Sequence, residues 1–300
     1  MDSYLNDWLS LLVRWLHVVA AIAWIGASFY FIQLDLKLRP PRRTEDEERG
    51  IAGDYWGVHG GGFYHSEKYR VAPATLPEPL HWFKWEAYAT WLSGFALFVV
   101  LYYAHPETYL IDPRVADIGK WVAIGLSIAL LAAAWLVYDL LCRVLGRDDR
   151  ALGVALALVV AGAAYGVTQV FSARAAFVQV GAMLGTMMAG NVLFNIIPAH
   201  RELISAKQAG RDPDPTPGVR AKQRSVHNNY LTLPVVFAMI SNHLPLVYGR
   251  DRAWLVLVAF MAIGAWVRHF FNLRHIGRSE WGILVTAALA LGLLAFALRP

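Results

Sequence analysis

Eight long apolar segments constrain the fold of this chain more than any other feature. A helix needs about 20 apolar residues to cross roughly 30 Å of hydrocarbon, and each segment approaches or exceeds that length. Hydrophobic residues make up 57% of the 300 residues and charged residues only 16%, with a mean hydropathy of +0.41. We therefore expect one all-α integral membrane domain over residues 1–300, a bundle of about eight transmembrane helices. The predicted spans are residues 9–34, 85–103, 118–141, 151–171, 175–197, 230–248, 253–271 and 281–298.

The sixth segment differs from the others because it contains polar residues and two prolines. Pro234, Asn242, His243 and Pro245 interrupt it. The pattern fits either a kinked span lined by polar groups or a re-entrant segment, and its length favours the span.

Basic residues are distributed unequally between the two sets of loops, which predicts the orientation in the membrane. One set contains Lys37, Arg39, Arg42, Arg43, Arg143, Arg147, Arg150, Arg201, Lys207, Arg211, Arg220, Lys222, Arg224, Arg274 and Arg278. The other set contains Arg114, Lys120, Arg174, Arg250, Arg252 and Arg299. The richer side should be cytoplasmic, so both termini are expected to be periplasmic in a bacterial inner membrane. No basic run is interleaved with aromatic residues as in a nucleic-acid-binding surface.

Cys142 is the only cysteine, which limits the cofactors that the chain can hold. A disulfide framework and the Cys-x-x-Cys-His sequence that attaches c-type haem covalently are both excluded. Any haem in this chain is therefore expected to be b-type, held by side chains.

The first loop, residues 35–84, is the only large segment outside the predicted membrane and is expected to be cytoplasmic. Within it, residues 54–70 combine aromatic rings, a glycine run at positions 60–62, two histidines and two cations. If residues 63–71 are extended, alternate side chains separate into two faces. One face carries Phe63, His65, Glu67 and Tyr69, and the other carries Tyr64, Ser66, Lys68 and Arg70.

Two interpretations of this loop remain open. A planar anionic ligand would find stacking surfaces and charge partners on such a segment. Alternatively, the glycines form a flexible turn followed by an amphipathic strand that lies on the membrane surface.

Histidines inside apolar segments are the second set of candidate site residues, since an imidazole in hydrocarbon needs a partner, a cavity or a metal. His17 and His243 lie at comparable depths, roughly 12 Å and 8 Å below the outer ends of their spans. They are candidate axial ligands of a haem, and Arg14 can reach a propionate from one turn away. His227 and His269, near the cytoplasmic face, are candidates for an inner haem. A histidine at a helix end also serves as a capping or headgroup-level residue.

Three segments resemble the bacterial membrane-bound urate oxidase (urate hydroxylase) family, and the similarity covers nearly the whole chain. The first contains Arg-Trp-Leu-His-Val-Val-Ala at 14–20 and Ala-Trp-Ile-Gly-Ala-Ser-Phe at 23–29. The second is Gly-Val-His-Gly-Gly-Gly-Phe-Tyr-His at 57–65, and the third is His-Asn-Asn-Tyr-Leu-Thr-Leu-Pro at 227–234. The first segment is less specific, because it also resembles other small haem-binding membrane proteins, among them a protoporphyrinogen oxidase family.

The resemblance implies oxidation of urate to 5-hydroxyisourate, with water as the oxygen source and electrons passing to a c-type cytochrome. Family members commonly carry a cytochrome c domain, which this chain lacks, so the acceptor is expected to be a separate protein or a missing domain. For the loop we expect His65 or His59 as base, with Glu67 and Tyr69 in the same catalytic cluster. Lys68 and Arg70 would hold the anion, with Tyr69, Trp56 and Phe63 supplying ring surfaces. One or two b-type haems would carry electrons outward, and the sequence is compatible with a homo-oligomer.

Two other functions remain open. A transporter or channel for urate or another purine would use the sixth segment and the intramembrane histidines as a polar path. A haem-bearing oxidoreductase acting on a porphyrin or quinol would share the pattern of the first span, although it gives no reason for the glycine and histidine loop.

Overall fold

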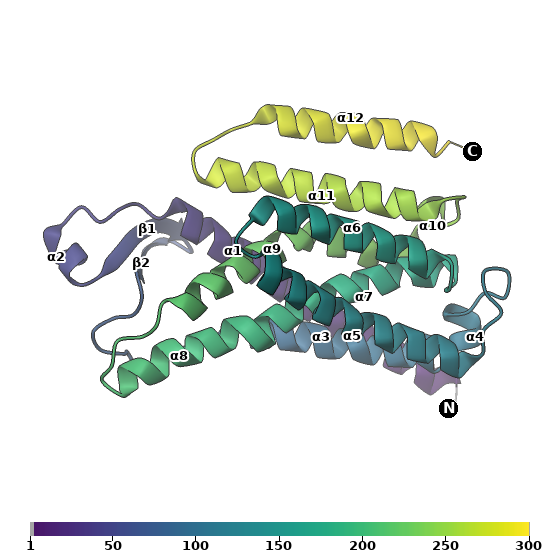
Figure 1. The fold of residues 1–300 in the computed structure, drawn as a ribbon, viewed down its shortest axis with the longest axis horizontal. Helices are drawn as coiled ribbons and strands as arrows, with labels where there is room; N and C mark the ends of the chain where they lie inside the picture. The colour runs from purple at the N-terminus through teal and green to yellow at the C-terminus, as the bar shows by residue number, and fades with distance from the viewer. Residues whose placement is uncertain (1–2, 300) are drawn as a thin grey trace.

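The computed structural model describes residues 3–299, in which helices running roughly along one long axis form most of the structure (Figure 1). Both termini lie at one end of this axis, and a β-hairpin extends from the opposite end. The elements in chain order are α1 (Ser3–Lys37), α2 (Thr44–Glu48), β1 (Ile51–His59), β2 (Gly62–Tyr69), α3 (Trp85–Phe98), η1 (Val99–Tyr103), α4 (Pro106–Tyr109), α5 (Lys120–Leu145), α6 (Asp149–Thr168), α7 (Ala173–Asn191), η2 (Val192–Ile196), α8 (Ile197–Gln208), α9 (Thr216–Ile240), η3 (Ser241–His243), α10 (Pro245–Tyr248), α11 (Ala253–His275) and α12 (Trp281–Ala297).

Within residues 3–299, five helical stretches are long and apolar enough to cross a membrane. They are Tyr4–Lys37, Lys120–Leu145, Asp149–Thr168, Ala173–Gln208 and Ala253–His275. The shorter α12 is also apolar, with 17 residues. The segments predicted as the second and sixth spans are helical as well, in α3 with η1 and in α9. The number of eight spans stays a prediction.

Helix α9 corrects the predicted limits of the sixth segment. It begins at Thr216 and ends at Ile240, whereas the hydropathy pattern predicted a segment from 230 to 248. Its first half is polar, and one side of it packs against the bundle, where Arg224 and Asn228 are buried. Hydropathy cannot detect such a segment, because a helix with polar side chains that bond to neighbouring helices has the same low hydropathy as a loop. His227 consequently lies inside a helix and does not open one.

Helix α7 is the central element of the core, since most of its residues are buried among α3, α5, α6 and α9. Small residues let its neighbours approach closely. A Cβ at Gly190 would overlap the Trp135 ring of α5, and a Cβ at Gly181 would lie 3.2 Å from Ala238 of α9. Close approach at glycine is the usual way for apolar helices to gain packing contacts in a bilayer.

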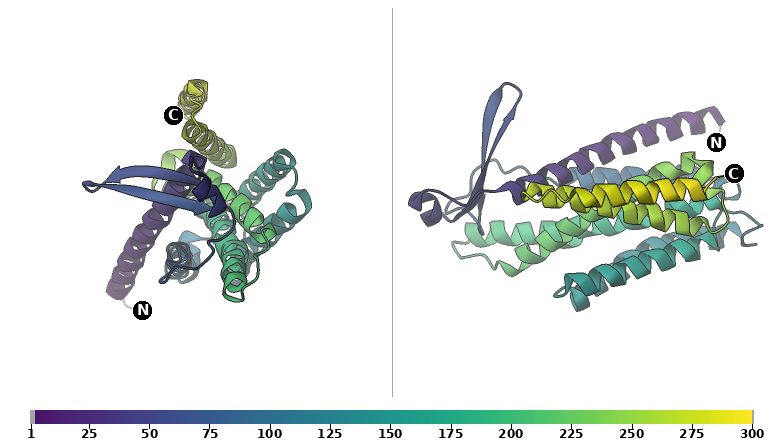
Figure 2. Two further views of the ribbon diagram at one scale, coloured as in Figure 1. Left: turned by 90° about the vertical axis from the view of Figure 1, so that its left-hand side faces the viewer. Right: turned by 90° about the horizontal axis from the view of Figure 1, so that it is seen from above.

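Helices α1 and α12 lie at the periphery and expose apolar side chains (Figure 2). Helix α12 packs chiefly on α11, and helix α1 packs chiefly on α3. Leu12, Trp15 and Ile22 of α1 and Leu289 and Leu293 of α12 are all more than half exposed. Continuous apolar surfaces of this extent are compatible with contact to lipid.

The hairpin of β1 and β2 projects beyond the helices (Figures 1 and 2). The strands pair antiparallel from His59 with Gly62 back to Ile51 with Tyr69. Gly60 and Gly61 connect them with φ angles of 59° and 81°, which fits a two-residue type I′ turn that glycine adopts without strain. The extended conformation considered for residues 63–71 is therefore present over residues 63–69, and Arg70 and Val71 lie beyond the end of the strand.

Candidate functional site

The hairpin brings His65, Asp54 and Trp56 together on one face. His65 Nε2 lies 2.9 Å from Asp54 Oδ2, and the Trp56 indole N–H donates to the same oxygen at 3.1 Å. The imidazole also stacks on the Trp56 ring, with centroids 4.2 Å apart. The hydrogen bond with His65 lowers the pKa of Asp54 below its ordinary value. Asp54 is therefore ionised at neutral pH and only accepts, so His65 donates from Nε2 and keeps its Nδ1 lone pair when neutral.

Two other charged residues of the predicted loop site, Glu67 and Lys68, form ion pairs within the structure. Arg49 pairs with Glu67 at 2.8 Å and donates to the Tyr69 hydroxyl at 3.3 Å. Lys68 pairs with Asp35 of α1. Lys68 is thus less available to a ligand than the sequence pattern predicted. Arg70 forms no ion pair with any described residue.

The remaining predicted loop residues are open to solvent. Phe63 is 79% exposed and Trp56 is 61% exposed, and His59 is also exposed at the turn. The two cavities described within residues 3–299 are both lined by residues outside the hairpin. The hairpin therefore carries a hydrogen-bonded His–Asp pair on an open surface.

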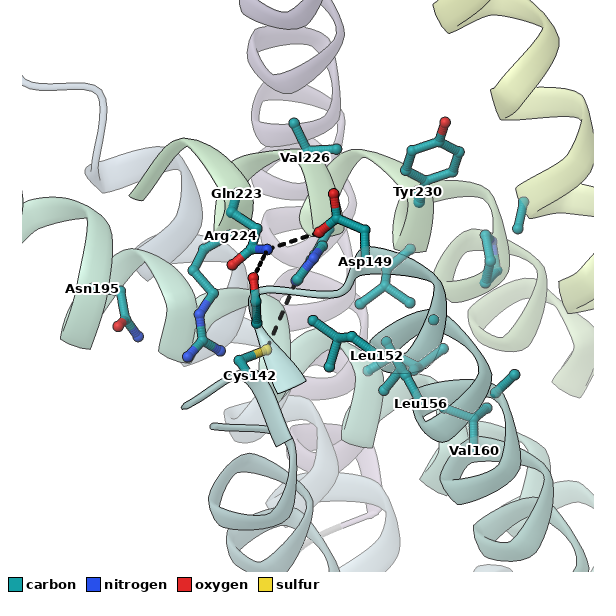
Figure 3. Close-up of a pocket in the computed structure, with 18 of the residues that line it drawn as sticks. Cys142, Asp149, Leu152, Leu156, Val160, Asn195, Gln223, Arg224, Val226 and Tyr230 are labelled. Atoms are coloured by element: carbon teal, nitrogen blue, oxygen red, sulfur yellow. Dashed lines mark hydrogen bonds between the residues drawn. The ribbon is translucent and has the colours of Figure 1, made fainter. Parts of the chain in front are cut away.

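A cavity with a volume of about 1260 Å³ lies between α5, α6, α9 and α11 (Figure 3). One part is charged and polar, lined by residues that include Arg143, Asp149, Arg220, Lys222 and His227. The rest is apolar, lined by residues that include Leu152, Leu156, Val160, Val258 and Met261. A cavity with one charged end and one apolar end suits an amphiphilic or planar anionic molecule.

A buried hydrogen-bond network supports the polar end of this cavity. The Asn191 side-chain amide donates to the Tyr138 hydroxyl and to Asn228 Oδ1, both at 2.8 Å. The Tyr138 hydroxyl in turn lies 2.8 Å from His227 Nδ1. Since each of these groups has a partner, the network fixes the orientation of the His227 ring at the cavity wall.

An ion pair adjoins the same network. Arg224 of α9 and Asp139 of α5 are both buried and lie 2.7 Å apart. Arg143, which is exposed, bonds to the second oxygen of Asp139, also at 2.7 Å. Sequence reasoning missed this pair, although Asp139 gave a signal as a lone carboxylate inside the predicted third span.

His17 occupies the contact between α1 and α3. Its Nδ1 lies 3.1 Å from the Thr90 carbonyl oxygen and 3.2 Å from Ser93 Oγ. A carbonyl oxygen only accepts, so Nδ1 carries the proton and neutral His17 keeps a lone pair on Nε2. A ligating histidine is commonly held in this way, with one ring nitrogen bonded to a backbone carbonyl.

Gly94 of α3 provides the space in which the His17 ring lies. A Cβ at this position would come within 2.8 Å of His17 Cε1. Substituting Gly94 with Ala should displace the ring or separate the helices, with a cost of about 1–3 kcal/mol in the free energy of unfolding. Thermal unfolding of the purified protein in detergent measures this effect. Gly26→Ala is the matched control, because Gly26 of α1 has open space around its Cβ position; equal stabilities of the two variants would contradict the packing argument.

The other predicted haem-binding residues lie in three different places. His243 is exposed in η3, and Arg14 is exposed on α1. His269 of α11 lies 2.7 Å from the Tyr230 hydroxyl through its Nδ1 and stacks against Trp266. Among residues 3–299, no hydrogen bond or ring contact joins His17 to His243 or His227 to His269. The pairing of these ligands remains a prediction.

The model of the urate oxidase N-terminal family matches residues 3–299. Searches of curated proteins and of solved structures found no match.

Proposed function

Since the chain belongs to the urate oxidase N-terminal family, we propose that it is a membrane-bound oxidoreductase that converts urate to 5-hydroxyisourate. The reaction joins urate with water and releases two electrons and two protons. Oxidation makes C5 of the purine electrophilic, and the oxygen of water then bonds to that carbon. The family match over nearly the whole chain is the observation that carries this proposal.

His65 is the proposed base, and His59 on the adjacent turn is its alternative. Asp54 holds the His65 ring through Nε2–H, which leaves Nδ1 to accept a proton from urate or from the attacking water. Glu67 and Tyr69 belong to the same proposed cluster, where both bond to Arg49. The contact between Asp54 and His65 resembles a catalytic His–carboxylate pair, in which the carboxylate orients the ring of the base.

Substrate binding is proposed for the cations and rings of the hairpin. Arg70, which has no carboxylate partner among the described residues, is better placed to hold the anion than Lys68, which pairs with Asp35. Trp56 and Phe63 expose ring surfaces on which a purine can stack.

A b-type haem is the proposed electron carrier, and the residues around His17 fit such a group. Thr90 and Ser93 orient the ring, Gly94 leaves room for the ring, and Nε2 keeps the lone pair with which His17 would hold the iron. When bound, haem iron accepts electrons one at a time. We propose His243 as the second ligand and Arg14 as a propionate partner, with His227 and His269 as candidates for a second haem.

The proposed acceptor is a c-type cytochrome on the periplasmic side of a bacterial inner membrane. Both termini lie at one end of the molecule, opposite the hairpin and the α8–α9 connection (Figure 1). The basic residues of the first loop and of the α8–α9 region lie toward the hairpin end, which the charge distribution assigns to the cytoplasm. We propose an eight-span arrangement with residues 35–84 in the cytoplasm, which agrees with both termini lying at the same end.

Turnover in water enriched in oxygen-18 tests the proposed reaction. The purified protein with urate and an oxidised c-type cytochrome should give 5-hydroxyisourate labelled from water, with two cytochromes reduced for each urate. Label arriving from dioxygen, or an absence of oxidation, would contradict it. Uptake of unchanged urate into proteoliposomes without oxidation would instead support the transporter.

A further inference from the structure

Arg268 is a buried cation inside the bundle, and it has no role in the function proposed above. It lies on α11 seven residues before the end of that helix at His275, or roughly 10 Å along the axis. Only 4% of its surface is exposed. An arginine at such a position usually reaches outward to the headgroups, and burial of its charge calls for a counter-charge.

The contacts of Arg268 hold the guanidinium in place but leave it without a counter-charge. Its Nε donates to Asn229 Oδ1 of α9 at 2.5 Å. The Phe29 ring of α1 lies against the guanidinium, 3.9 Å from centroid to Cζ. Its Nη2 is buried and has no hydrogen-bond partner. No ion pair among residues 3–299 includes Arg268.

Arg224 is a second buried arginine in the bundle, and its role is structural. It is equally buried at 4%, and its guanidinium meets the Asp139 carboxylate at 2.7 Å. Removing a charge from water without a partner costs several kcal/mol. Since Arg268 lacks such a partner, packing alone does not explain it.

Polar groups around Arg268 extend the site on the α9 and α11 sides. The Asn229 amide donates to Asn272 Oδ1 at 3.0 Å, which fixes Asn229 with its carbonyl oxygen toward Arg268. The neighbouring Tyr230 and His269 bond to each other at 2.7 Å. Lys37 and Arg274, in the last turns of α1 and α11, add positive charge at this end of the bundle.

We propose that Arg268, positioned by Asn229 and Phe29, binds a planar oxyanion inside the bundle. A guanidinium with its plane fixed and an unpaired N–H suits a delocalised oxyanion better than a point charge. Two sources fit this chemistry and rest on the proposed function: the urate anion, and a propionate carboxylate of haem. The first source would place the substrate between the helices and not on the hairpin.

The decisive variant is Arg268→Met, which keeps much of the side-chain length and removes the charge. The full chain in lipid nanodiscs is assayed for thermal unfolding, urate affinity by equilibrium dialysis, and haem content by its absorbance. Without ligands, Arg268→Met should unfold at the same temperature as wild type or higher, because an unpaired charge no longer has to be buried. Arg268→Lys retains the charge and serves as the second variant, and Arg278→Met, at an exposed arginine in the connection between α11 and α12, is the control.

The source of the oxyanion decides which measurement changes. Urate as ligand predicts about tenfold to a hundredfold weaker urate binding by Arg268→Met with unchanged haem content. Haem as ligand predicts a loss of haem with unchanged urate binding. The proposal is overturned if wild type and Arg268→Met retain urate and haem equally, including the case in which neither retains any. It is also overturned if Arg268→Met destabilises the ligand-free protein as much as Asp139→Asn, a substitution that breaks the ion pair between Arg224 and Asp139. Failure of urate turnover in wild type, by contrast, counts against the proposed function and leaves this comparison unaffected.

Discussion

Replacing His65 with Ala is expected to lower the rate of urate oxidation by about two to four powers of ten. The substitution removes the proposed base and leaves Asp54 without the ring that it now orients at 2.9 Å. Haem content should be unchanged, because the hairpin projects away from the helices that carry the proposed haem ligands. Steady-state reduction of a c-type cytochrome by urate measures the rate.

Two further histidine variants make this prediction specific. His81→Ala changes an exposed histidine of the same loop that contacts Phe83, and it should leave the rate near that of wild type. His59→Ala decides between the two candidate bases. A full rate in His65→Ala combined with a large loss in His59→Ala would transfer the role of base to His59, and full rates in both would remove the hairpin from the mechanism.

Asp139→Asn is expected to destabilise the protein by about 3–5 kcal/mol, the usual cost of breaking a buried ion pair by removing one partner. Arg224 would stay buried with its charge uncompensated. The hydrogen-bond network that orients His227 would lose the ion pair that adjoins it. The free energy of unfolding in mixed detergent micelles measures the loss.

Arg143→Gln is the matched control, because Arg143 bonds to the same carboxylate from an exposed position. Its effect should stay below about 1 kcal/mol. Replacing both buried partners, as in Asp139→Leu with Arg224→Met, should restore much of the stability, since an apolar pair avoids the desolvation cost. Similar losses in Asp139→Asn and Arg143→Gln would contradict the assignment of Arg224 as the partner that matters.

The helices were predictable wherever apolar composition alone defines them, and α9 shows where this reasoning fails. A run of about 20 apolar residues has few alternatives to a helix in a membrane protein. The first half of α9 instead contains polar residues that bond to α5, α6 and α7, so its helical state depends on partners that are distant in sequence. Strand β1 was missed for the same reason, because pairing with β2 decides its conformation.

The candidate site was predictable in its residue types but not in its pairings. His17 stood out because a histidine deep in an apolar segment needs a partner, and the structure supplies Thr90 and Ser93. The loop histidines were chosen for their aromatic and glycine-rich surroundings, yet Asp54 as the partner of His65 depends on the register of the hairpin. Arg268 was passed over because an arginine near a helix end resembles an ordinary interfacial residue until its burial is known.

An absorbance difference spectrum, recorded on the purified protein without oxygen before and after urate is added, tests the central claim most directly. The account predicts that urate alone produces the Soret and visible bands of a reduced b-type haem, and that a c-type cytochrome then reoxidises it. A purified protein without a Soret band, or a haem that urate leaves oxidised, would contradict the account.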